Sequence, residues 1–277
     1  MTAAALDLLD AWPVPHAAAG VVAGDGRGLL AVRGDRARPH RWASITKVVT
    51  ALAVLVAVEE GTVDLDQPAG PPGATVRHLL AHASGLAFDE ERTLARPGRL
   101  RIYSNTGYEV VAGALADRAG MPFAAYLGEA VLDPLRLTAT RLEGSPAAGL
   151  VGPLDDLLRL AAELVTPTLV AVETLRLATT VAFPGLSGVL PGFERHDRQD
   201  WGLGFELRDQ KAPHWTGRRN SPATFGHFGG SGSFLWVDPA AGLACVALSG
   251  RDFGPWAKDA WPVFSDAVLG QFAAPAG

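Results

Sequence analysis

The stretch that decides the fold is Ser44-Ile-Thr-Lys-Val-Val-Thr-Ala-Leu-Ala-Val-Leu-Val-Ala-Val-Glu-Glu60. It predicts one long helix, because its apolar side chains cover most faces and such a helix is buried. Gly61 follows it, as is common at a helix C-terminus. Ser44 and Lys47 are three residues apart, so the hydroxyl and the amine share one face of the helix and can meet.

The Ser44–Lys47 pair has the residue types of a nucleophile and its base. A serine hydroxyl is a poor nucleophile until a base takes its proton, and a lysine becomes such a base when burial lowers its pKa. The chain has only three lysines, so arginine serves as its general cation, and arginine keeps its proton. A helix N-cap at Ser44 with an exposed Lys47 fits the same four residues. The pair therefore needs support from other motifs.

Strand-like runs lie on both sides of a mostly helical middle. A short helix is expected over 2–12, with strands over 17–22 and 28–32 and a turn at 24–26 between them. The middle is expected to hold helices at 76–82, 105–119, 123–132, 154–165 and 172–181. The last part predicts strands at 203–207, 224–228, 233–237 and 243–248, and a closing helix at 256–272.

This order predicts an α+β fold, in which an antiparallel sheet formed by both chain ends is flanked by helices. Residues 1–42 and 195–277 would form the sheet lobe, and residues 43–194 an inserted all-helical lobe. The two lobes would make one discontinuous catalytic unit. Sites often form in the cleft that such an arrangement leaves.

Composition excludes several functions. The chain of 277 residues is 48% hydrophobic and 19% charged, which is typical of a globular protein and not of a disordered one. A net charge of -5 argues against nucleic acid as a partner, since phosphate binding needs clustered cations. The single Cys245 lies in an apolar run and is expected to be a core thiol. We expect a small-molecule or short-peptide substrate.

The first ten residues carry two acids and no base, whereas a secretory signal begins with positive charge. The longest apolar stretch, 48–58, is too short to span a bilayer. The sequence therefore predicts a cytoplasmic protein without a membrane partner, or a secreted one if a removed signal precedes these residues.

A second motif is Tyr103-Ser104-Asn105. A tyrosine that faces a buried amine can relay a proton, and asparagine offers a donor and an acceptor to a substrate amide. Tyrosine and asparagine are rare in this chain, with three and two copies, so a chance pairing is uncommon. A helix start capped by Ser104 or Asn105 beside a packed tyrosine is the alternative.

A third motif is Gly226-His-Phe-Gly-Gly-Ser-Gly232. A glycine-rich strand lets a substrate approach the backbone, whose N–H groups can point at a developing oxyanion. His227 can bind a substrate carboxylate or assist a proton relay. A hairpin turn explains the glycines equally well, but it does not explain the other two motifs.

Together the three motifs resemble those of the serine β-lactamases and penicillin-binding proteins. The closer match is the branch with Tyr-x-Asn second and His-x-Gly third, which includes class C β-lactamases, D-alanyl-D-alanine carboxypeptidases, D-aminopeptidases and family VIII esterases. Residues 76–86 and 235–239 also resemble segments of that branch, and the resemblance runs from about residue 40 to 250. It implies a β-lactamase/transpeptidase-like fold.

The resemblance also implies roles. Ser44 would attack a carbonyl, Lys47 and Tyr103 would handle its proton, and water would release the acyl-enzyme. The N–H groups of Ser44 and Gly230 would form the oxyanion hole, with Gly229 beside them. Asn105 would bind the substrate amide, and Tyr103 would protonate the leaving group. No metal or cofactor is implied.

One departure from the family concerns the substrate. Where many relatives have Lys-Thr-Gly, this chain has His227-Phe228-Gly229. An imidazole is partly neutral at pH 7. This weakens the case for binding the carboxylate of a β-lactam or a D-alanine terminus, and it favours an ester or a less charged amide.

Two other functions were weighed. The fold can serve as a binding or sensing module that is acylated once and stays modified. His78 and His82 have the spacing of a zinc protease helix, but the catalytic glutamate of His-Glu-x-x-His is missing. Zinc hydrolysis is therefore disfavoured, and the retention of Ser44, Lys47, Tyr103 and Asn105 together favours an enzyme that turns over.

Overall fold

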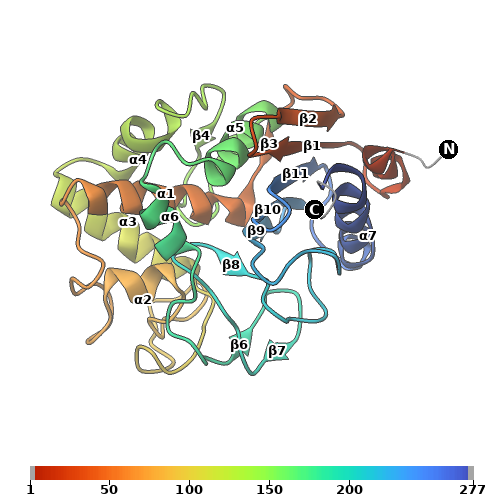
Figure 1. Cartoon of the computed structure of the whole chain (residues 1–277). Helices are drawn as coiled ribbons and strands as arrows, with labels where there is room; N and C mark the ends of the chain where they lie inside the picture. The colour runs from red at the N-terminus through yellow and green to blue at the C-terminus, as the bar shows by residue number, and fades with distance from the viewer. Residues whose placement is uncertain (1–3, 274–277) are drawn as a thin grey trace.

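The computed structural model describes residues 4–273 and contains a six-stranded antiparallel sheet built from both ends of the chain (Figure 1). The strand order is β2-β1-β11-β10-β9-β8. The strands are β1 (Ala17–Ala23), β2 (Gly28–Arg33), β8 (Glu206–Leu207), β9 (Phe225–Gly229), β10 (Ser233–Asp238) and β11 (Leu243–Ser249). The predicted α+β class, with its antiparallel sheet and flanking helices, is confirmed.

The centre of the sheet joins the two ends of the chain. β1 pairs with β11 from Ala17 opposite Ser249 to Ala23 opposite Leu243. Side chains alternate along a strand between the two faces. Cys245 on β11 is accordingly packed in the core, and burial raises the pKa of its thiol.

Helices cover both faces of the sheet. The 3-10 helix η1 (Ala5–Ala11) and α7 (Pro255–Phe272) pack on the face that holds Val21 and Trp236. α5 (Leu154–Val165) packs against β1, β10 and β11 from the other face. Gly20 permits this contact, because a Cβ there would lie 2.8 Å from Cδ2 of Leu158.

The remaining helices form a group to the side of the sheet (Figure 1). The predicted long helix is α1 (Thr46–Glu59), preceded by the 3-10 turn η2 (Ala43–Ile45). It is buried on most faces, as its composition predicts. The others are α2 (Val76–Leu80), α3 (Asn105–Ala119), α4 (Phe123–Leu127), the π-helical turn η3 (Gly128–Leu132) and α6 (Val172–Ala178).

The structure adds short strands that no sequence pattern predicted. A three-stranded sheet has the order β3-β5-β4, with β3 (His40–Arg41), β5 (Leu150–Gly152) and β4 (Arg141–Leu142). A two-stranded hairpin joins β6 (Gly188–Val189) to β7 (Arg195–His196). Strands of two or three residues are too short to produce a period of two in hydrophobicity.

Other expectations differ in extent. The first helix is a 3-10 helix over Ala5–Ala11, and residues 2–3 of the prediction lie outside the described range, as do the outermost residues of the predicted sheet lobe. The strand predicted at 203–207 is reduced to β8, because Gly204 has a φ of +97°. The packing differs from the predicted division into lobes. Residues 43–194 are predicted to be all-helical, but they also contain β4, β5 and β6, and their helix α5 packs on the sheet. Within residues 4–273 no helix is long and apolar enough to cross a membrane.

Candidate active site

Ser44 lies in η2, directly before α1, where strand β9 approaches the backbone closely. A Cβ on Gly229 would lie 2.3 Å from the carbonyl oxygen of Trp42, so only glycine allows this approach. Ala43 has a φ of +46°, a left-handed conformation that is uncommon for a residue other than glycine. Such conformations persist where the surrounding structure fixes them, often at active sites.

Ser231 of the third motif and Ser233, which follows the motif, hold this segment. The Ser231 hydroxyl donates to the carbonyl of Arg41 at 2.6 Å, and the Ser233 hydroxyl donates to the carbonyl of Trp42 at 3.1 Å. The sequence analysis did not assign them a role. They connect the glycine-rich strand to the residues just before Ser44, which explains part of the motif physically.

Lys47 is completely buried, and its Nζ lies 3.3 Å from Oγ of Ser44. Nζ also donates to Oδ1 of Asn105 at 2.6 Å and to the carbonyl of Ala147 at 2.9 Å. Burial lowers the pKa of Lys47 to about 7, although the more distant charges of Asp89 and Glu109 oppose the shift. A lysine with this pKa is partly neutral at pH 7 and can accept a proton.

Asn105 is the first residue of α3 and bridges Lys47 to an acid. Its Oδ1 accepts from Lys47, and its Nδ2 donates to Oδ1 of Asp89 at 2.8 Å. The predicted cap of this helix is Ser104, whose hydroxyl accepts from the N–H of Gly107 at 2.9 Å. Both ends of the Asn105 amide therefore have partners within the protein, and a substrate amide would have to share them.

Tyr103 packs among aromatic rings beside the lysine. Nζ of Lys47 lies 4.7 Å from the centre of its ring, which is a favourable position for a cation over an aromatic face. The ring of His82 lies 4.4 Å away and that of Phe88 5.9 Å away. Burial raises the pKa of Tyr103 well above its usual value, while a hydrogen bond with Ser44 opposes the shift. The hydroxyl is therefore protonated at neutral pH.

His227 is buried and close to Tyr103. Its Nδ1 lies 2.7 Å from the carbonyl oxygen of Phe228, and its Nε2 lies 3.4 Å from the Tyr103 hydroxyl. A carbonyl oxygen can only accept, so Nδ1 carries the proton and Nε2 is free to accept. Burial, aided by the charge of Lys47, lowers the pKa of His227 to about 3. The imidazole is therefore neutral at pH 7.

A cavity of about 190 Å³ opens beside these groups. Ser44, Tyr103, His227 and Gly230 line it, and a Cβ on Gly230 would meet no atom within 4 Å. The rest of the lining is largely apolar and consists of Phe88, Leu190, Pro191, Gly192, Trp201, Glu206, Phe228 and Phe253. None of these residues, all within the described range, is a lysine or an arginine. Lys47 and Asn105 are not among the residues that line it.

Arg101 fixes the strand-like segment that leads to Tyr103. Its guanidinium is buried and donates to four backbone carbonyls at 2.6–3.1 Å. The acceptors are those of Ala81, Ala182, Phe183 and Gln199. Burial lowers the pKa of Arg101 to about 10, so the group stays charged. The sequence analysis missed this residue, because a single arginine has no distinguishing pattern.

Glu206 is a second feature that the sequence did not indicate. Its carboxylate is buried, with Oε1 2.5 Å from Nζ of Lys211 and Oε2 accepting from Trp215 at 3.0 Å. Oε2 also lies 2.9 Å from Nε2 of His214. Burial alone raises the pKa of Glu206, but His214 and Lys211 outweigh it and lower the pKa to about 2. The group is an anion with its partners in place.

The two histidines of the zinc-like spacing have separate partners. α2 ends at Leu80, and His82 lies beyond it with a φ of +54°. Nδ1 of His78 lies 2.9 Å from the Thr75 hydroxyl, whereas Nδ1 of His82 accepts from the N–H of Ser104 at 3.1 Å. His82 therefore supports the Tyr103 segment. Within residues 4–273 no group of three or more His, Cys, Asp and Glu side chains is placed to hold a metal ion.

Comparison with known proteins identifies a family model and several proteins that are similar to this chain. The Beta-lactamase family model matches residues 3–267. The crystal structure of a beta-lactamase from Mycobacterium bovis is 53% identical, covers 98% of this chain and 100% of its own, and superposes with a TM-score of 0.95. EstCE1, described as a hydrolase with promiscuous acyltransferase activity, is 18% identical, covers 96% of both chains and has a TM-score of 0.79. That likeness concerns the fold.

A curated relative matches over a shorter region. The D-alanyl-D-alanine-carboxypeptidase/endopeptidase AmpH of Escherichia coli is 26% identical over 155 residues. The match covers 41% of this chain and 40% of that relative's length. Because the family model spans nearly all of the sequence, the chain belongs to the Beta-lactamase family.

Proposed function

We propose that this chain is a serine hydrolase that cleaves carboxylic esters through an acyl-enzyme on Ser44. The observation that carries the proposal is the position of Lys47, whose buried Nζ lies 3.3 Å from Oγ of Ser44 and has a pKa of about 7. A nucleophile and a base within hydrogen-bonding reach are the signature of covalent catalysis.

Lys47 is the first base in this proposal, and Tyr103 is the acid. Neutral Lys47 takes the Ser44 proton as Oγ attacks the carbonyl carbon, and the N–H groups of Ser44 and Gly230 stabilise the oxyanion. Tyr103, protonated because of its raised pKa, gives its proton to the leaving alkoxide and regains one from Lys47. Water then attacks the acyl-enzyme and releases the acid and free Ser44.

The cavity supports an ester in preference to a β-lactam. The carboxylate of a β-lactam needs a cation or several donors, and no lysine or arginine is among the described residues that line the cavity. His227 is neutral, with a pKa of about 3, and Glu206 is paired with Lys211, so neither group offers a free cation to a carboxylate. Phe228 and Phe253, whose ring centres are 4.7 Å apart, add an apolar wall.

Intact-mass analysis with a fluorophosphonate, a cephalosporin and a nitrophenyl ester tests the proposal. We expect labelling of the wild-type chain, none of Ser44→Ala, and a burst of nitrophenol followed by steady release. Ser221→Ala is the matched control, because Ser221 lies in the loop before β9 and bonds to Asp238. A stable adduct without turnover would instead indicate a binding or sensing module. A kcat/KM that is higher for the cephalosporin than for the nitrophenyl ester would refute the ester preference.

A further inference from the structure

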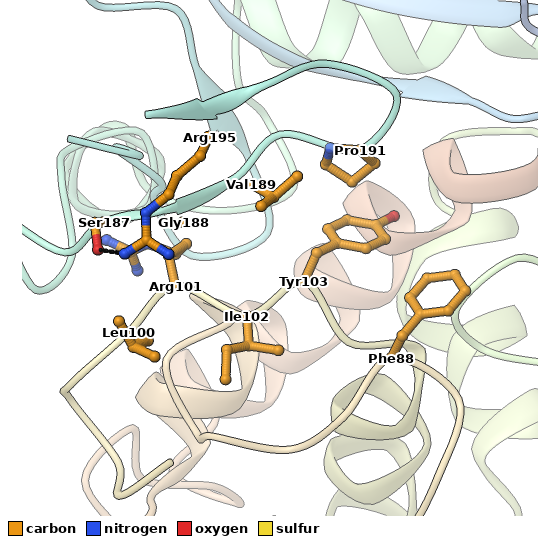
Figure 2. Close-up of a pocket in the computed structure, with 10 residues that line it drawn as sticks. All are labelled: Phe88, Leu100, Arg101, Ile102, Tyr103, Ser187, Gly188, Val189, Pro191 and Arg195. Atoms are coloured by element: carbon orange, nitrogen blue, oxygen red, sulfur yellow. Dashed lines mark hydrogen bonds between the residues drawn. The ribbon is translucent and has the colours of Figure 1, made fainter. Parts of the chain in front are cut away.

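A second hollow of about 350 Å³ adjoins the Ser44 cavity and shares Phe88, Tyr103 and Pro191 with it (Figure 2). Leu100 and Ile102 lie on one side of it, and Val189 of the β6–β7 hairpin lies on the other (Figure 2). We call this hollow the apolar groove. It lies beside the ring of Tyr103, whose hydroxyl points away from Leu100 and Ser187 (Figure 2).

The walls of the groove are fixed to each other. The N–H of Arg101 donates to the carbonyl of Ser187 at 2.9 Å, and Arg101 forms a parallel bridge with Gly188. A Cβ on Gly188 would lie 2.3 Å from the carbonyl oxygen of Arg101, so the two backbones are in close contact. The groove is therefore preformed, as ligand sites usually are.

Two arginines line the groove: Arg101 is fully engaged, and Arg195 lies beside Ser187, at the end of the groove away from Tyr103 (Figure 2). The guanidinium of Arg101 donates to four carbonyls, as described above, and Nη2 of Arg195 donates to the Ser187 hydroxyl at 2.7 Å. No acidic residue is among the described residues that line it. Phe88 and Val189 each leave 51% of their surface exposed, and both line the groove, so apolar surface is available to a ligand there. The part of the groove near Tyr103, lined by Phe88, Ile102, Val189 and Pro191, is apolar and fits an uncharged hydrocarbon group.

We propose that the apolar groove binds the alcohol part of the ester, and that the substrates are esters of apolar alcohols. This inference rests on the proposed function, in which Tyr103 protonates the leaving oxygen. Phe88, Tyr103 and Pro191 line both the groove and the Ser44 cavity, so the carbon chain attached to that oxygen passes along the Tyr103 ring into the groove. The acyl group lies on the other side of the scissile bond, toward Ser44 and Gly230.

Two ester series test the assignment. Acetates of ethyl, butyl and hexyl alcohol all form the same acetyl-enzyme, so only the alcohol part varies. We expect kcat/KM to rise by up to about fourfold for each added methylene, the value for full burial of a CH₂ group. Ethyl esters of acids of increasing length should show no comparable rise. A flat alcohol series, or a rise confined to the acid series, overturns the inference.

A pair of variants connects the effect to the groove. Val189→Asp places a carboxylate at the groove and should flatten the alcohol series. Val172→Asp is the control, because Val172 is 61% exposed on α6 and lies outside the groove. An unchanged slope in Val189→Asp overturns the inference. Failure of the proposed function looks different: no acetyl adduct appears by mass with any ester, and hydrolysis persists in Ser44→Ala.

Discussion

The Tyr103 hydroxyl lies 3.4 Å from Nε2 of His227, and the other ring nitrogen of this histidine is bonded to the carbonyl of Phe228. This pairing orients the proposed proton donor with a neutral acceptor instead of an ammonium. His227 of the third motif thus contacts Tyr103, and because it is neutral it offers no positive charge to a substrate carboxylate.

Replacing the imidazole by an ammonium should change the substrate preference. In His227→Lys we expect the ratio of cephalosporin to nitrophenyl ester kcat/KM to rise about tenfold or more, because a hydrogen bond to a charged group contributes about 1.5–3 kcal/mol. The ratio is measured by steady-state kinetics with both substrates. His78 lies outside the Ser44 cavity, so His78→Lys is the control and should keep the wild-type ratio. A lower ratio in His227→Lys would contradict this interpretation.

Activity should follow the protonation of Lys47. The base is the neutral amine, so kcat/KM for an uncharged ester should be high above pH 7 and fall as pH drops through the pKa of about 7. Lys47→Arg stays protonated at every accessible pH and should lose about 10²–10⁴-fold in kcat/KM. Rates between pH 5 and 9 check both points. A flat profile for the wild-type enzyme would exclude Lys47 as the base.

Two adjacent glycines should respond differently to alanine. Gly229→Ala places a Cβ 2.3 Å from the carbonyl oxygen of Trp42, so it should displace the Ser44 segment and destabilise the fold by about 1–3 kcal/mol. The Cβ added in Gly230→Ala would lie more than 4 Å from the atoms around it, so this variant should keep the wild-type stability. Urea unfolding measures the difference. Equal stability of the two variants would mean that β9 and the Trp42 backbone do not approach as described.

The buried ion group around Glu206 should matter for stability. Glu206→Gln leaves Lys211 without its charge partner, and breaking a buried pair in this way costs about 3–5 kcal/mol. Because the pKa of Glu206 is lowered to about 2 in the folded state, its contribution is complete above its ordinary value of 4.5 and is lost as pH falls toward 2. The gap between the wild type and Glu206→Gln in urea unfolding should therefore narrow over that range. A gap that is independent of pH would speak against an ionised Glu206.

Sequence reasoning could predict the elements that have clear apolar runs. The apolar run after Lys47 predicts α1, and the strand-like apolar runs near both ends predict the central strands of the sheet. It also named the residues that the structure brings together at Ser44, because Lys47 and Tyr103 belong to short motifs with rare residue types. Their catalytic roles stay predictions.

The parts that could not be predicted depend on contacts between distant residues. The hairpin of β6 and β7 has two residues in each strand and is held against Arg101 by backbone bonds, which no local pattern encodes. The partners of Glu206 lie five, eight and nine residues away in an irregular segment. Only the folded chain shows that these groups line or support the cavity.

The pairing of β1 with β11 has a consequence for the order in which the protein is made. During synthesis β1 is made long before β11, one of its two neighbours in the sheet. His227 and Gly230 are likewise translated long after Ser44. A nascent chain that already contains Ser44 and Lys47 therefore lacks one wall of their cavity until β9 and the residues after it have been synthesised.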